Sequence, residues 1–318
     1  MIRRILCIAI ALCTCAAFSG CKKAPVGTEG NPVEVWFMPL KDDAVFKANA
    51  PVIEAFLKEK TGYAVKATLA PSFVAIVKAF GNKDADVAFM NTLGYLLAHD
   101  WAGATAALKY VYGDLYKTYQ GEIIARVGAG IDKPADISGK TFAFADPYSA
   151  GGYLYALKYF EDNKITPSKT VFTKGHLDAV EKVYRGEVEA AATYYERPTW
   201  DGSARDARAE LLTKYPDILS KIKIVALTEK IPTGCITLRK DMPDEMKQKI
   251  TAAFSEFAKT PQGRKALMEL YNVTGFVPTK DAEYDEVRTV VKKEGKTIQD
   301  MVPGAAAYYK SSIEVGLE

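Results

Sequence analysis

The sequence has few histidines and lacks the motifs of a catalytic or nucleotide site. Its two histidines, His99 and His176, lie far apart in a chain of 318 residues and share no metal-ligand spacing with a cysteine. No Gly-x-Ser-x-Gly elbow occurs, and the segment 128–130 lacks the third glycine of a dinucleotide fingerprint. These absences argue against a metalloenzyme, a serine hydrolase and a dehydrogenase. We therefore expect no catalytic residues, no metal and no cofactor.

The chain also lacks an excess of charge of one sign. It has 42 lysines and arginines against 39 acidic residues, and the formal net charge of +3 is too small for a typical nucleic-acid-binding protein. Hydrophobic residues make up 48% and charged residues 25%, which excludes a disordered chain and a protein that spans the membrane many times. The length allows one large domain or two of moderate size.

The longest uncharged run lies at the amino terminus. Arg3 and Arg4 precede residues 5–18, which are too few to span a bilayer but are typical of the core of a signal peptide. Small residues then precede Cys21, and this pattern resembles the lipobox of bacterial lipoproteins, in which the cysteine receives a lipid. We expect a signal peptide over 1–20 and lipidation at Cys21. The alternative is an ordinary secretory signal with an incidental cysteine.

Cysteine is almost absent from the rest of the chain. Only Cys235 follows Cys21, so an exported form would have no internal disulfide and would depend on its core for stability. The apolar run around Cys235 predicts a buried small side chain. Residues 21–32 show no apolar periodicity, which predicts a flexible tether.

From residue 33 onward, short strand-like runs alternate with amphipathic segments. The predicted strands cover 33–38, 63–69, 85–90, 108–112, 122–127, 141–145, 170–173, 190–194, 222–227 and 235–238. The predicted helices cover 45–60, 73–80, 93–100, 153–163 and 176–185. Two more helices follow, the first capped by Asp241 and the second started by Thr260 and Pro261. This alternation predicts parallel α/β sheets in two series, with a ligand cleft between two lobes.

A glycine-rich turn follows the predicted strand 141–145. The strand ends at Asp146 and a helix begins near Ser149, so that Gly151 and Gly152 would leave the first backbone amides of the helix uncovered. Such amides, together with the helix dipole, form a site for an anion. Ser149 can donate its hydroxyl to a ligand or merely cap its own helix, and the local sequence leaves both roles open.

Other strand ends predict the remaining walls of the cleft. Asn91 and Thr92 follow a strand and can cap the next helix or donate to a ligand. The first strand delivers Trp36, Met38 and Leu40 to the same edge. Aromatic residues recur at these turns, which predicts a lined pocket.

Several segments, in their order along the chain, carry a family resemblance. Residues 86–95, Asp-Val-Ala-Phe-Met-Asn-Thr-Leu-Gly-Tyr, resemble a D-V-A-F turn that ends in tyrosine. Residues 139–152 are similar to a G-K-x-F-A-F-x-D-P-x-S-x-S-G motif, and 175–191 to a G-x-H-x-A-V…G-x-V-D-A motif. The match continues through 231–243 and 275–278. The set resembles the phosphate-, phosphite- and phosphonate-binding (PhnD-like) periplasmic proteins of ABC importers over about residues 33–290.

The resemblance implies an α/β fold of the two-lobed periplasmic-binding-protein type II, or flytrap, kind. Each lobe would be an open mixed sheet flanked by helices. Lobe one would hold 33–118 and 233–300, lobe two would hold 119–232, and 301–318 would form a tail. The lobes would close on a small ligand because both contact it. ABC permease and ATPase subunits would then carry out transport.

The resemblance also implies site residues. Tyr95 and His176 match positions near the ligand, and the turn after the strand 190–194 matches the one that selects the ligand's tail. The family places hydroxyl residues where this chain has Ala150 and Gly151, so a phosphonate would be held by fewer bonds. The expected ligand-binding residues are Trp36, Met38, Leu40, Asn91, Thr92, Tyr95, Tyr148, Ser149, Ala150, Gly151, Gly152, His176, Tyr194, Tyr195 and Glu196.

The sequence thus predicts an extracytoplasmic solute-binding lipoprotein of an ABC importer. It would be lipid-anchored in the cell envelope, on the periplasmic or extracellular face, and would capture a phosphonate, phosphite or phosphate-like oxyanion. One alternative keeps the fold but binds an amine or aromatic metabolite through residues such as Tyr194 and Glu196. Another is a ligand-sensing adaptor for a membrane receptor.

Overall fold

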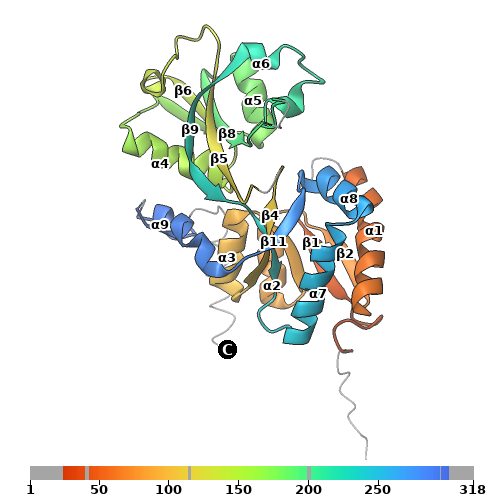
Figure 1. The fold of residues 1–318 in the computed structure, drawn as a ribbon. Coiled ribbons are helices and arrows are strands. Elements are labelled where there is room, and N and C mark those ends of the chain that lie inside the picture. Colours follow the sequence, from red (N-terminus) through yellow and green to blue (C-terminus); the bar gives the residue numbers. More distant parts are fainter. Residues whose placement is uncertain (1–23, 40–42, 114–115, 199–201, 294, 301–318) are drawn as a thin grey trace, which may run out of the picture.

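A computed structural model describes residues 24–39, 43–113, 116–198, 202–293 and 295–300. It contains a six-stranded and a five-stranded sheet, each flanked by helices, and the two units form the two lobes of the molecule (Figure 1). The predicted signal peptide, Cys21, Leu40 and residues 301–318, predicted as a tail, lie outside the described residues. Among the helices of the described part, none has the length and hydropathy that crossing a bilayer requires.

The six-stranded sheet has the order β11-β4-β10-β3-β1-β2. Its strands are β1 (Val33–Phe37), β2 (Val65–Leu69), β3 (Val87–Met90), β4 (Thr105–Val111), β10 (Cys235–Leu238) and β11 (Gly275–Pro278). Its helices are α1 (Asp43–Thr61), α2 (Phe73–Asn82), α3 (Thr92–Ala102), α7 (Asp244–Phe257), α8 (Pro261–Tyr271) and α9 (Asp285–Lys293), the last preceded by the 3-10 turn η4 (Asp281–Tyr284).

The five-stranded sheet has the order β7-β6-β8-β5-β9. Its strands are β5 (Thr118–Arg126), β6 (Thr141–Phe144), β7 (Lys169–Phe172), β8 (Ala190–Tyr195) and β9 (Ile222–Pro232). The helices are α4 (Tyr155–Asp162), α5 (His176–Arg185) and α6 (Ile218–Lys221), and the short turns are η1 (Pro134–Ile137), the π-helical η2 (Ala150–Leu154) and η3 (Ala209–Leu211).

Both sheets are mixed, as the family resemblance implies. β1 pairs in parallel with β2 and β3, but β10 runs antiparallel to β3 and β4. In the second sheet, β5 runs antiparallel to β8 and β9. The prediction of purely parallel sheets from alternation alone is therefore wrong. β10 returns to the first sheet from the far lobe rather than through a local crossover helix, so nothing forces it into the parallel direction.

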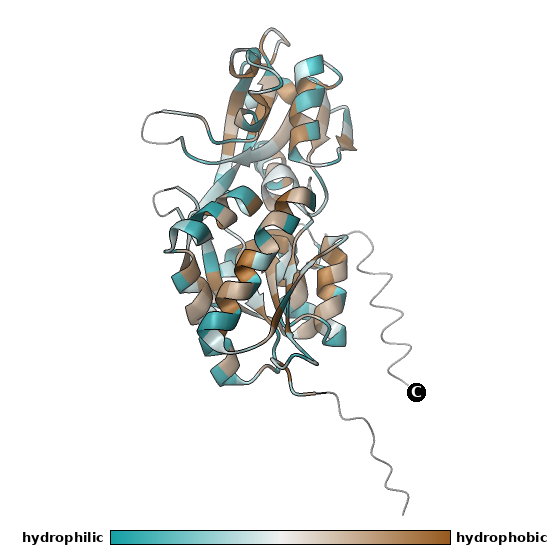
Figure 2. Cartoon of the chain, turned by 90° about the vertical axis from the view of Figure 1, so that its right-hand side faces the viewer, coloured by the Kyte–Doolittle hydropathy of each residue, from teal (hydrophilic) through white to brown (hydrophobic). Residues whose placement is uncertain are grey.

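Apolar side chains fill both faces of the first sheet. Val33, Val35 and Phe37 alternate along β1 and pack under α1 and α7, with Phe37 stacked on Phe89 at 4.6 Å between ring centroids. The helices accordingly show hydrophobic stripes toward the sheets and hydrophilic ones outside (Figure 2). Burying one such side chain stabilises the fold by roughly 1.5–3 kcal/mol.

Two of the predicted helix starts have different outcomes. Thr260 caps α8 as predicted, since its Oγ1 accepts the Gly263 amide at 2.9 Å. The prediction that Asp241 caps α7 is wrong, because the helix begins after Pro243. Asp241 instead accepts a hydrogen bond from Arg239, whose charge is a stronger partner than a backbone amide. Cys235 is buried and free, as predicted.

Candidate functional site

A cavity of about 1190 Å³ lies between the two sheets. The six-stranded side contributes residues in or next to β1, β3, β4 and β10, at the start of α1 and at the end of α8, namely Met38, Pro39, Val45, Asn91, Thr92, Tyr110, Tyr112, Gly234, Glu269, Leu270, Tyr271 and Asn272. The five-stranded side contributes Tyr119, Lys174, Gly175, His176, Leu177, Asp178, Glu181, Tyr194, Glu196, Glu210 and Lys214. A cavity with walls from both lobes can hold a ligand that both lobes contact.

Asn91 and Thr92 form the start of α3 on the first wall. Asn91 caps the helix, since its Oδ1 accepts the Gly94 amide at 2.7 Å. Its Nδ2 reaches the Tyr148 carbonyl at 3.4 Å and so joins the two lobes. Thr92 Oγ1 donates to the Pro232 carbonyl at 2.7 Å. Both side chains are held in place by the backbone, at a helix end where the dipole favours negative charge.

The glycine-rich turn after β6 is more enclosed than its sequence predicts. Ser149 Oγ accepts the Gly152 amide at 2.9 Å and caps its own helix. The prediction of uncovered first-turn amides is therefore wrong for Gly152. Ser149 Oγ also lies 3.2 Å from His176 Nε2, so the turn is tied to the wall of the cavity through a hydrogen bond with that histidine.

His176 starts α5 and lies between two hydroxyls. In addition to the contact with Ser149, its Nδ1 lies 2.9 Å from Thr193 Oγ1. Burial lowers the pKa of His176 to about 4, because the interior disfavours the imidazolium. The ring is therefore neutral at pH 7 and can accept at one nitrogen while it donates at the other.

Carboxylates and tyrosines gather beside His176, whose ring contacts that of Tyr194 at 5.0 Å between centroids. Glu196 pairs with Arg205 at 3.0 Å, and its side chain is only 12% exposed. Burial raises the pKa of Glu196 to about 7, against the opposing effect of Arg205. The Tyr194 hydroxyl donates to Glu210 beside it. This part of the cavity therefore offers negative charge and aromatic faces, which suit a cationic group.

The structure brings together some of the predicted residues. Those that line the cavity are Met38, Asn91, Thr92, His176, Tyr194 and Glu196, and Ser149 joins them through His176. Among the described residues, the cavity lining does not include Trp36, Tyr95, Tyr148, Ala150, Gly151, Gly152 or Tyr195. Whether any of these residues binds a ligand remains a prediction.

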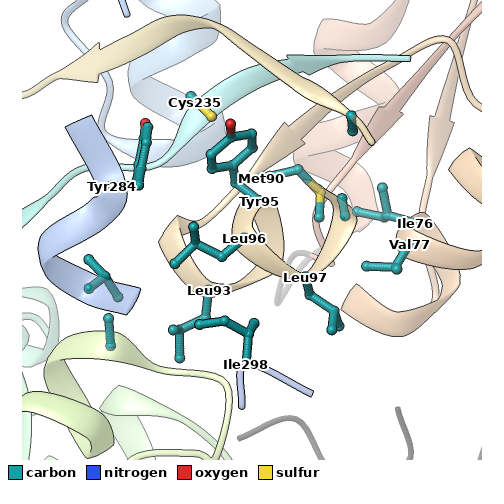
Figure 3. Close-up of a cluster of buried hydrophobic side chains, with 14 of the residues drawn as sticks. Ile76, Val77, Met90, Leu93, Tyr95, Leu96, Leu97, Cys235, Tyr284 and Ile298 are labelled. Carbon is teal, nitrogen blue, oxygen red and sulfur yellow. The ribbon is translucent and has the colours of Figure 1, made fainter. Parts of the chain in front are cut away.

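Tyr95 lies in the core of the first lobe rather than in the cavity. Its hydroxyl donates to Asp281 Oδ1 at 2.6 Å, and its ring packs on Tyr284 at 4.7 Å between centroids. Figure 3 draws it beside Tyr284 and Cys235, among the apolar side chains of α3. Trp36 is likewise engaged elsewhere, since its indole nitrogen donates to the Asp84 carbonyl at 3.2 Å.

Sequence reasoning missed several residues of the cavity wall. Tyr110, Tyr112 and Tyr119 come from strand ends near the crossing between the lobes, and Tyr271 comes from the end of α8. Their positions in separate strands and helices gave no local motif. Within the described part, no group of three or more His, Cys, Asp and Glu residues is arranged to hold a metal ion.

Comparison with known proteins gives a consistent result. Residues 35–284 match the family model described as ABC transporter, phosphonate, periplasmic substrate-binding protein. The chain is 26% identical over 239 residues to the phosphonates-binding periplasmic protein of Escherichia coli, covering 73% of this chain and 68% of that protein. It is 23% identical to the phosphate-import protein PhnD of Mycolicibacterium smegmatis, covering 91% of this chain and 94% of that protein.

A solved structure shares the fold. A binding protein component of an ABC phosphonate transporter from Pseudomonas aeruginosa superposes with a TM-score of 0.68 at 21% identity, covering 91% of this chain and 95% of that one. Neighbours of this kind are type II periplasmic binding proteins, and the fold predicted from the sequence is confirmed.

Proposed function

Because the chain belongs to the family of periplasmic substrate-binding proteins of phosphonate ABC transporters, we propose that it captures a small phosphonate in the cavity between its lobes. The family is one of binding proteins that deliver a ligand to a permease, and we infer no catalytic step in this chain. The observation that carries the proposal is the cavity itself, whose walls come from both sheets.

We assign the oxyanion end of the ligand to the wall near Asn91, Thr92 and His176. The start of α3 lines this wall, and η2 lies behind it, joined to it by the hydrogen bond between Ser149 and His176. Backbone amides at the first turn of a helix and the helix dipole favour negative charge. The neutral His176 avoids the cost of burying a cation, and its two ring nitrogens hold Ser149 and Thr193 in place behind this wall. Such a wall supports binding of a phosphonate, phosphite or phosphate group.

We assign the other end of the ligand to Tyr194, Glu196 and Glu210. A carboxylate beside aromatic rings supports binding of an ammonium group. An aminoalkylphosphonate would satisfy both ends at once, and this is the ligand class that we favour.

Calorimetric titration at pH 7.5 tests the proposal with phosphate, phosphite, methylphosphonate and 2-aminoethylphosphonate. We expect binding of methylphosphonate and tighter binding of 2-aminoethylphosphonate, because only the latter reaches both walls. If none of the four binds, the oxyanion assignment is wrong.

A second candidate ligand is an amine or aromatic metabolite without an oxyanion. The observation that favours it is the set of cavity carboxylates, of which Glu196, Glu210 and Glu269 accompany the tyrosines. Ethylammonium and phenethylammonium in the same titration distinguish the two candidates. Binding of these cations, together with no response to methylphosphonate, would favour the second.

We also propose that Cys21 carries a lipid and holds the protein at a membrane surface, on the extracytoplasmic side. The support is the short apolar run that ends in small residues before this cysteine. When the protein is expressed from its full coding sequence and partitioned between detergent and water, the wild type should enter the detergent phase and Cys21→Ala should stay in the aqueous phase. Equal partitioning of both into water would reject the anchor.

We also propose that the chain passes between the lobes at 118–119 and at 232–233.

A further inference from the structure

Tyr119 lies where the two lobes meet. It belongs to β5, which begins as the chain enters the five-stranded sheet, and it lines the cavity. Its ring packs against Gly151 in the glycine-rich turn: a Cβ atom at position 151 would come within 3.0 Å of Tyr119 Cε2. A serine at 151, as the family motif has, would therefore force this ring to shift by a few tenths of an ångström. The tyrosine occupies space that the glycine leaves free.

The ring of Tyr119 lies near two elements of the proposed oxyanion wall. Tyr119 lines the same cavity as Thr92 at the start of α3, and its Cε2 edge faces Gly151 in η2. Few side chains could reach both elements at once, because they belong to different lobes. The position of β5 makes this reach possible, because its backbone lies against the turn: a Cβ atom at Gly121 would lie 2.5 Å from the Gly151 carbonyl oxygen.

We propose that Tyr119 is a specificity-determining residue, whose hydroxyl donates to the ligand's oxyanion in place of the hydroxyls absent at Ala150 and Gly151. This inference rests on the proposed function. Gly151 and Tyr119 form a compensating pair. The glycine leaves room for the ring, and the hydroxyl on the ring replaces the missing hydrogen-bond donor. Burial raises the pKa of Tyr119, so the hydroxyl keeps its proton and can donate throughout the neutral range.

The pair explains why the loss of hydroxyls in the turn is compatible with an oxyanion ligand. Tyr119 lines the same cavity as Asn91, Thr92 and His176, so its side chain borders the space to which the oxyanion is assigned.

The test is calorimetric titration of methylphosphonate and 2-aminoethylphosphonate into wild type, Tyr119→Phe and the control Tyr63→Phe. Tyr63 packs against the core of the first lobe, beside Lys249, and is not among the described residues that line the cavity. We expect Tyr119→Phe to lower the affinity for both ligands by roughly tenfold or more, because both ligands carry the oxyanion. The control should change neither affinity by more than about twofold. Unchanged affinity in Tyr119→Phe would overturn the inference.

A second comparison tests the pairing independently of the hydroxyl. Gly151→Ser alone should weaken binding, because the new side chain meets the Tyr119 ring. The double variant Gly151→Ser/Tyr119→Ala should bind methylphosphonate at least about tenfold more tightly than Tyr119→Ala, since serine then supplies the donor. Additive effects of the two substitutions would overturn the pairing. Absence of any binding by the wild type would instead reject the proposed function, so the two failures are distinguishable.

Discussion

Glu196 illustrates how the interior of the cleft sets the chemistry of a single residue. Its carboxyl is nearly enclosed, and burial raises its pKa to about 7 even though Arg205 opposes the shift. Since protonation removes the negative charge, the group is ionised above pH 7 and neutral below it. An ammonium group of a ligand beside Glu196 should therefore be attracted by a negative charge on this carboxyl only above about pH 7.

At this scale we predict that the wild type and Glu196→Gln differ in their affinity for 2-aminoethylphosphonate by an amount that depends on pH. The affinity for 2-aminoethylphosphonate should favour the wild type by about tenfold at pH 8 and by little at pH 5.5, because Glu196 is then protonated and resembles glutamine. Calorimetry of both proteins with the same ligand cancels the ligand's own ionisation. A constant ratio across this range would contradict the prediction, and methylphosphonate, which has no ammonium, should give a constant ratio.

The short π-helical element η2 depends on close backbone packing. A Cβ at Gly152 would lie 2.6 Å from Ala145 Cβ and 2.9 Å from His176 Cε1. Any side chain there must push β6 or α5 away, and His176 would lose its position beside Ser149. The element thus couples the glycine of the turn to the wall of the cavity.

At the scale of the element, we predict that Gly152→Ala lowers stability by about 1–3 kcal/mol and weakens oxyanion binding. Gly275→Ala is the matched control, since a Cβ at Gly275 meets no atom within 4 Å. The control should be neutral or slightly stabilising because alanine restricts the unfolded chain. Melting curves and titrations of both variants check this. Equal melting temperatures for the two variants would contradict the packing argument.

Contacts between the lobes act at the scale of the whole molecule. Tyr148 stacks on Phe73 at 6.0 Å between ring centroids, and its carbonyl accepts from Asn91. A buried cluster also crosses the boundary, since Leu154 and Tyr155 pack with side chains of α3 and α9. These contacts favour the arrangement in which the lobes meet, before any ligand adds its own.

We predict that Tyr148→Ala shifts the unliganded protein toward separated lobes. An aromatic pair is worth about 0.5–1.5 kcal/mol, so the equilibrium between the two arrangements should change by roughly two- to twelvefold. Small-angle X-ray scattering should give a larger radius of gyration for this variant than for wild type, and saturating methylphosphonate should remove the difference. Tyr215→Ala, which loses a tyrosine pair within one lobe, should scatter like wild type. Identical scattering of all three would refute the prediction.

Much of the fold followed from local sequence patterns. The period of apolar residues predicted β1, α5 and β10 closely, because burial on one face imposes that period wherever the element lies. Thr260 and Pro261 predicted the start of α8, because capping involves only neighbouring residues. Asp241 failed as a cap because its carboxylate pairs with Lys83, which lies far away in the sequence at the end of α2, as well as with the neighbouring Arg239.

The sequence by itself determined the elements, the two-lobed family fold and some of the cavity wall, since strand ends in such folds meet at one edge. Tertiary structure alone decided which side chains face the cavity. Tyr95 lies in a motif but turns to Asp281, whereas Tyr119 and Tyr271 lie in no motif and line the wall. The physical reason is that a side chain's partner is selected by contacts between segments far apart in the chain, and no local pattern encodes those distances.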